Sequence, residues 1–242
     1  MAVNAEVLPR RRPSDRNLFL WAAVLFPLFV LTGYFKSYYF SAFFTDVRPI
    51  ANALVHAHGL VMSSWVLYFV AQVALIRTKN IKLHMTLGFF GIALAALVIV
   101  VGMMTAYDAQ LVRHAAPPGA DPHEFFILPF GDMFLFVVFF AGAIYYRKRP
   151  REHKSLMLMT AINFVPAALF RIPPVPPEYT YLFAFGTPAL IAVFCLLWLR
   201  IKHGKTNYIF AAAIALYVFL VPFRIYFAQT QIWHGFTNWL VS

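Results

Sequence analysis

The chain has 242 residues, of which 62% are hydrophobic, and it carries a formal net charge of +11. A soluble domain has closer to half of its residues apolar, so this composition excludes an ordinary soluble enzyme. The basic residues lie between the apolar runs, so the charge gives no reason to expect nucleic acid as a partner. Cys195 is the only cysteine, which excludes an intramolecular disulfide and a thiolate metal cluster.

Seven continuous apolar runs are spread over the chain, and each is long enough to cross ~30 Å of hydrocarbon as a helix. Because they are continuously apolar rather than alternating, we expect helices and not strands of a barrel. The first run follows a basic segment, but no small-residue cleavage site follows it, so we expect a retained span. The expected fold is an all-α polytopic bundle of about seven transmembrane helices, at residues 18–34, 51–76, 83–107, 129–146, 155–172, 179–200 and 207–228.

Lysine and arginine are divided unequally between the two sets of loops that these spans create. The set that includes the N-terminus holds fifteen of these residues, and the other set holds five. Because basic loops stay in the cytoplasm, we expect the N-terminus inside and, after an odd number of spans, the C-terminus outside. The expected organisation is a cytoplasmic basic tail at 1–17, a transmembrane domain at 18–228 and an interfacial tail on the outer side at 229–242.

Five polar residues are expected at the outer depth of the bundle. An isolated carboxylate at this depth is costly, so Asp132 is expected to form a structural ion pair with Arg171 or Arg224. His56 and His58 point to nearly opposite sides of a helix, so both can bind one metal only if the helix is distorted or begins between them. A metal site made of His56, His58 and Asp132 is the alternative use of this layer.

Two histidines are expected at the inner depth. His84 and His153 each stand in or just before the first turn of a span, at the same face of the membrane. A face of small residues allows close approach of a flat group or of another helix, so this face suits either the edge of a porphyrin or ordinary helix packing. The small residues that follow His84 on this face are Gly88, Gly91, Ala95 and Gly102.

The remaining histidines fall in loops or in the tail. We expect them to be solvated, with His123 the exception, because it can fold back toward the outer layer. These residues are His114, His123, His203 and His234.

The residues that several known classes of membrane protein require are absent from this sequence. No expected span contains the deep lysine that a retinal protein needs. The motifs of HExxH metalloproteases, of GxSxG hydrolases and of Walker-type nucleotide sites are absent from the sequence. A seven-span zinc hydrolase needs about three ligands at one depth, and the last span contains no histidine. A transporter or a metal-dependent membrane hydrolase therefore stays as a further alternative only.

Four short motifs lie between residues 50 and 175. His56-Ala57-His58-Gly59 opens one span and Leu83-His84-Met85-Thr86-Leu87-Gly88 opens the next, while Gly131-Asp132-Met133 and His153-Lys154-Ser155-Leu156-Met157 open two later ones. Together they resemble an uncharacterised group of bacterial multi-pass membrane proteins. The resemblance implies a helical membrane fold in a bacterial-type inner membrane, and it implies no activity.

The inner histidines also resemble the ligands of the transmembrane b-type cytochromes, which move electrons from ascorbate or quinol. These proteins carry histidines on a four-helix core with one haem near each face. His84 and His153 look like one such pair. The outer pair is incomplete, because Asp132 stands where a histidine opposite His56 or His58 would be required.

The functional expectation is a membrane electron-transfer protein with haem b bound by His84 and His153. The outer residues His56, His58, Asp132 and Arg171 would then serve a quinol, a proton or a transition metal. The expected partners are the lipid bilayer, quinone and other membrane subunits. The alternative is a non-catalytic accessory or assembly subunit of a larger membrane complex.

Overall fold

The computed structural model describes residues 15–46, 52–117, 119–172 and 175–242, and every regular element in this part of the chain is a helix. The expected all-α membrane bundle is confirmed, and most of the expected cytoplasmic tail lies outside the described residues. The longer α-helices are α1 (Arg16–Tyr34), α2 (Ala53–Arg77), α3 (Ile81–Tyr107), α5 (Ile127–Tyr145), α6 (Pro150–Ile162), α8 (Pro177–His203), α9 (Tyr208–Ala228) and α10 (Gln231–Val241). The short elements are η1 (Phe35–Tyr39), η2 (Ser41–Phe43), η3 (Asp108–Val112), α4 (Pro122–Phe125) and α7 (Val165–Leu169).

The helices begin where the sequence offers a side chain that caps them. Asn52, Asn80 and Asn207 each accept a hydrogen bond from the backbone N–H three residues further on, at the starts of α2, α3 and α9. Such a cap satisfies one of the backbone donors that the first turn leaves free. Gly204 ends α8 with φ +67°, a conformation that glycine adopts without strain.

Six helical segments in the described part of the chain are long and apolar enough to cross a membrane. They correspond to six of the seven expected spans, and most of their ends agree with the expected ends to within several residues. The exception is the segment expected at 155–172, where the structure has α6 and α7 with an interruption between them. The six segments are Asn17–Tyr39, Ala53–Arg77, Ile81–Val112, Pro122–Tyr145, Glu178–His203 and Tyr208–Ala228.

The interruption between α6 and α7 has a local cause. Pro166 has no N–H, so it cannot donate to the carbonyl of Ile162 as a continuous helix requires. The chain turns more tightly there, and Phe164 N–H donates to the Ala161 carbonyl at 3.2 Å. Asn163 Nδ2 donates to the Asp132 carbonyl of α5 at 2.8 Å, which holds the turn against the neighbouring helix.

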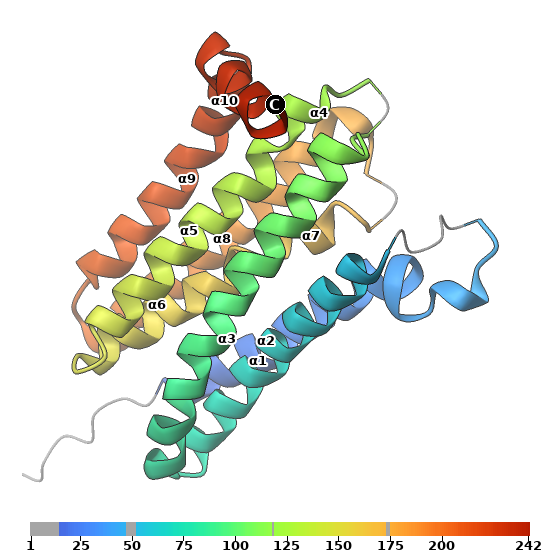
Figure 1. Ribbon diagram of the computed structural model, residues 1–242. Helices are drawn as coiled ribbons and strands as arrows, with labels where there is room; N and C mark the ends of the chain where they lie inside the picture. Colours follow the sequence, from blue (N-terminus) through green and yellow to red (C-terminus); the bar gives the residue numbers. More distant parts are fainter. Residues whose placement is uncertain (1–14, 47–51, 118, 173–174) are drawn as a thin grey trace, which may run out of the picture.

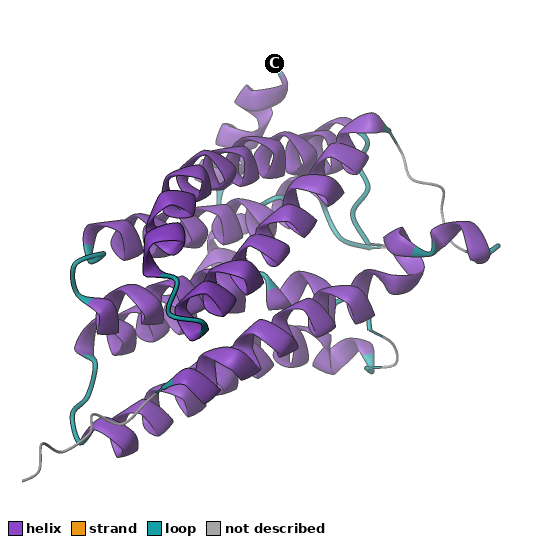
Figure 2. Cartoon of the chain, turned by 90° about the horizontal axis from the view of Figure 1, so that it is seen from below, coloured by secondary structure: helices purple, strands orange, loops and turns teal. Residues whose placement is uncertain are grey.

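The broken segment lies inside the bundle. Nearly every residue from 155 to 169 is buried, with α6 packed on α5 and α9 and α7 packed on α1 and α8. Figure 1 shows α1 and α2 on one side, α5, α6, α8 and α9 on the other, and α3 and α7 between them. Figure 2 shows the same bundle from below. The helix α10 crosses one end, next to α4, and this end is called the α10 end below.

Candidate functional site

His84 and His153 meet at the end of the bundle opposite α10. His84 lies in the first turn of α3, and His153 lies in the first turn of α6. Their ring centroids are 6.5 Å apart, and the ring planes are nearly perpendicular at 77°. The two residues are far apart in the sequence, so the packing of the bundle is what brings the two imidazoles together.

The backbone fixes the orientation of one imidazole. His153 Nδ1 is 2.8 Å from the carbonyl oxygen of Ala143 on α5. A carbonyl only accepts, so Nδ1 is the donor in this contact and Nε2 is the ring nitrogen left for another partner. Metal-binding histidines commonly have this outer hydrogen bond. His84 Nδ1 is buried and has no hydrogen-bond partner within the described ranges.

The small-residue face of α3 is used mainly for helix packing. A Cβ atom added to Gly91 would lie 2.1 Å from the Tyr68 hydroxyl of α2, and one added to Gly102 would lie 3.0 Å from Met133 Sδ of α5. Gly88 differs, because no atom lies within 4 Å of the Cβ position there. Only the turn next to His84 therefore stays open on this face.

The distance between the two imidazoles suits two ligands of one metal. Imidazoles on opposite sides of a metal ion each have a nitrogen about 2 Å from it, which puts their ring centroids roughly 6 Å apart. In the described ranges, no group of three or more His, Cys, Asp or Glu side chains is placed to hold a metal ion.

Asp132 forms its ion pair with Arg224. Arg224 Nη1 donates to Asp132 Oδ1 at 2.6 Å and to the Leu128 carbonyl at 3.2 Å. The guanidinium carbon lies 4.5 Å from the centre of the Phe185 ring, and the Arg224 side chain is only 4% exposed. This pair joins α5 to α9 inside the bundle, close to the turn between α6 and α7.

Arg171, the other expected partner of Asp132, lies elsewhere. Its guanidinium donates to the Ala167 carbonyl and lies 4.4 Å from the centre of the Tyr34 ring. Among the described residues, His58 Nδ1 is buried and has no hydrogen-bond partner.

His56 and His58 diverge on α2, as their spacing on a regular helix requires. His56 is exposed, its ring lies 6.0 Å from that of Tyr38, and its carbonyl accepts a hydrogen bond from the Tyr38 hydroxyl. Asp132 is paired with Arg224. The side chains of His56, His58 and Asp132 therefore do not lie together in the structure as the suggested metal site would require.

Several loop and tail histidines make specific contacts, including His114, His203 and His234, which were expected to be solvated. His203 Nε2 bonds to the Asp15 carboxylate, which also accepts a hydrogen bond from Lys154 Nζ. At the α10 end, His123 lies with its ring centroid 6.5 Å from those of both His114 and His234. The sequence gives no signal for the contact of His203 with Asp15, because it joins segments that are distant in the chain. The sequence singles out His123, but it does not indicate that His234 of α10 is its neighbour.

No family model, no curated protein and no solved structure matches the chain. The motif resemblance to an uncharacterised bacterial group stays a prediction.

Proposed function

We propose that the protein is an integral membrane electron-transfer protein that binds one b-type haem between His84 and His153. The observation that carries this proposal is the 6.5 Å separation of the two imidazoles, which come from different helices. The hydrogen bond from His153 Nδ1 to the Ala143 carbonyl leaves Nε2 available as a ligand. The bound haem would supply one-electron chemistry.

The number of protein ligands favours haem over a bare ion. Structural zinc sites use four protein ligands and catalytic ones use three. Haem iron needs only axial ligands from the protein, because the porphyrin supplies the others. Two imidazoles and the open position beside Gly88 suit that requirement. His56 and His58 diverge on α2 and do not form a second pair, so the proposal includes one haem only, at His84 and His153.

The same proposal places the protein in a bacterial-type inner membrane. The loops on the His84 side carry the excess of lysine and arginine, which supports a cytoplasmic position for that side. His84 and His153 would then lie near the cytoplasmic surface. A quinol or another membrane subunit is the proposed electron partner.

The interruption between α6 and α7 favours a transporter as the second candidate. Broken helices beside buried charged residues are a common feature of substrate sites in transporters. Here the turn at Asn163 contacts α5 at Asp132, whose side chain is paired with Arg224. No internal sequence repeat accompanies this feature, so electron transfer is the preferred function.

The visible spectrum and haem content of the purified protein test the proposal. We expect a Soret band in the wild-type protein, after haem supplementation if necessary, and loss of most bound haem in His84→Ala and in His153→Ala. His56→Ala is the matched control, because that exposed histidine lies outside the pair. A wild-type protein that never binds haem would overturn the proposal and leave the transporter or an accessory subunit. Equal haem content in all three variants would overturn the ligand assignment.

A further inference from the structure

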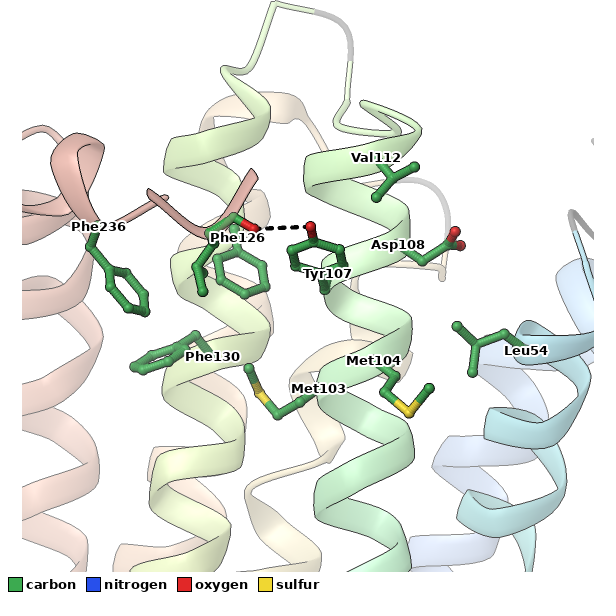
Figure 3. Close-up of a pocket in the computed structure, with 10 residues that line it drawn as sticks. Leu54, Met103, Met104, Tyr107, Asp108, Val112, Phe126, Phe130 and Phe236 are labelled. Carbon is green, nitrogen blue, oxygen red and sulfur yellow. Dashed lines mark hydrogen bonds between the residues drawn. The ribbon is translucent and has the colours of Figure 1, made fainter. Parts of the chain in front are cut away.

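A groove of about 550 Å³ lies at the α10 end of the bundle. Figure 3 shows it around the end of α3, with Leu54 of α2 on one side and Phe130 and Phe236 on the other. Met103 of α3 lies between the two aromatic rings and the helix axis. The volume is typical of sites that hold a small molecule or part of a larger ligand. Among the described residues, Asp108 is the only charged one in the lining.

The helix α10 is held in place as one wall of this groove. The Tyr107 hydroxyl donates to the Leu240 carbonyl at 3.0 Å, and Trp233 Nε1 donates to the His123 carbonyl at 2.8 Å. Trp233 is buried, whereas Trp239 on the same helix is 69% exposed. An amphipathic helix with an exposed tryptophan is typical of the membrane interface. The groove therefore opens at the depth of the lipid headgroups.

Arg113 does not line the groove but lies next to it, because it is ion-paired with the lining residue Asp108. Asp108 accepts hydrogen bonds from Arg113 Nε at 2.7 Å and from Asn52 Nδ2 at 3.1 Å. Within the described ranges, the two terminal guanidinium nitrogens of Arg113 have no hydrogen-bond partner, and its side chain is 32% exposed. The hydrogen bond to Asp108 uses Nε alone, so the two terminal nitrogens remain for a second anion, although Asp108 offsets part of the guanidinium charge. Guanidinium groups bind phosphate oxygens particularly well.

We propose that this groove binds one phospholipid, with an acyl chain along Met103, Phe130 and Phe236 and the phosphate at Arg113. Flexible methionine and aromatic side chains fit the irregular shape of such a chain. A quinone ring would instead need hydrogen-bond donors for its two carbonyl oxygens. The Tyr107 hydroxyl, which could donate, is already bonded to the Leu240 carbonyl.

Photo-crosslinking tests this assignment. The full chain would be reconstituted in nanodiscs that contain a phosphatidylethanolamine with a photoactivatable acyl chain, and the labelled residues would be identified by mass spectrometry. Met103→Trp fills the groove, and Arg113→Gln removes the phosphate ligand at an exposed position. Leu60→Trp is the control, because Leu60 is 69% exposed on α2 and lies outside the groove.

We expect preferential labelling of the groove in the wild-type protein and in Leu60→Trp. Arg113→Gln should reduce it by about tenfold, the effect of one charge-assisted hydrogen bond, and Met103→Trp should abolish it. Uniform labelling of all lipid-facing helices would overturn the proposal, and so would groove labelling that Arg113→Gln leaves unchanged. Preferential labelling of the groove by a photoactivatable quinone would overturn the choice of a phospholipid.

Discussion

At the residue scale, the buried ion pair of Asp132 and Arg224 stands out. Both side chains are largely withdrawn from the surface, and Arg224 Nε and Nη2 have no hydrogen-bond partner in the part of the chain that the structure describes. Burying two charges costs several kcal/mol per ion before their attraction is counted. The positive charge of Arg224 is compensated by one oxygen of Asp132, by the Leu128 carbonyl and by the face of the Phe185 ring. The burial of either charged side chain therefore depends on the presence of the other.

We predict that Asp132→Leu lowers the free energy of unfolding by about 3–5 kcal/mol, because it leaves the Arg224 charge uncompensated in the bundle. The double variant Asp132→Leu/Arg224→Met removes both charges and should be close to the wild-type protein. Denaturant unfolding in detergent, followed by circular dichroism, measures the difference. If the double variant were as unstable as Asp132→Leu alone, the uncompensated charge of Arg224 would not be the cause of the lost stability.

Asp15 is the second residue whose charge has a structural role. Burial alone would raise the pKa of its carboxyl, but the hydrogen bonds and charges of Lys154 and His203 lower the pKa below the ordinary value. Its side chain is 5% exposed, and it joins the start of α1 to α6 and to the end of α8. A carboxyl whose pKa is lower in the folded state stabilises the fold when it is ionised.

We predict a loss of thermal stability in acid that depends on Asp15. Its contribution is fully present above the unfolded pKa of about 4 and disappears as the pH falls through the lower pKa of the folded state. Asp15→Asn should lower the melting temperature at pH 7 and flatten its dependence on pH below about 5. Asp46→Asn is the control, because the Lys36–Asp46 pair is exposed. Identical pH profiles for the wild-type protein and Asp15→Asn would contradict this role.

At the scale of elements, hydrophobicity predicted most helices, because a long apolar run has few other stable forms in a membrane. At 155–172 the structure has two shorter helices in place of the expected continuous span. Its sequence shows Pro166, but the position of the turn also depends on Asn163 reaching the Asp132 carbonyl of another helix. The first turns of α6 contain Arg151, Glu152 and Lys154, so this helix is also less apolar than a typical span.

The candidate site was predictable only in part. The proximity of His84 and His153 could be anticipated, because each residue begins a span at the same membrane face. Residues at the same depth are the only ones that can become neighbours across the bundle, so few partners were possible. The choice of Arg224 over Arg171 could not be anticipated, since both lie at a similar depth and helix rotation separates them. The contact of His203 with Asp15 joins distant polar segments, and no periodic pattern indicates such a contact.

At the scale of the whole molecule, polar groups gather at the two ends of an apolar bundle. His84 and His153 lie at one end, and α10 with its groove lies at the other. About 20 residues of α3 separate the two sites, which corresponds to roughly 30 Å of helix. A ligand in the groove is too far away to exchange electrons directly with a haem at His84. The two proposals therefore concern separate sites and can be tested separately.

Electron paramagnetic resonance of the oxidised, haem-loaded protein tests the central proposal most directly, because it reports whether two imidazoles bind the same iron. We predict a low-spin signal for the wild-type protein and conversion to a high-spin signal in whatever haem His153→Ala retains. A high-spin signal in the wild-type protein, or a low-spin signal that survives the loss of either His84 or His153, would contradict the proposed site.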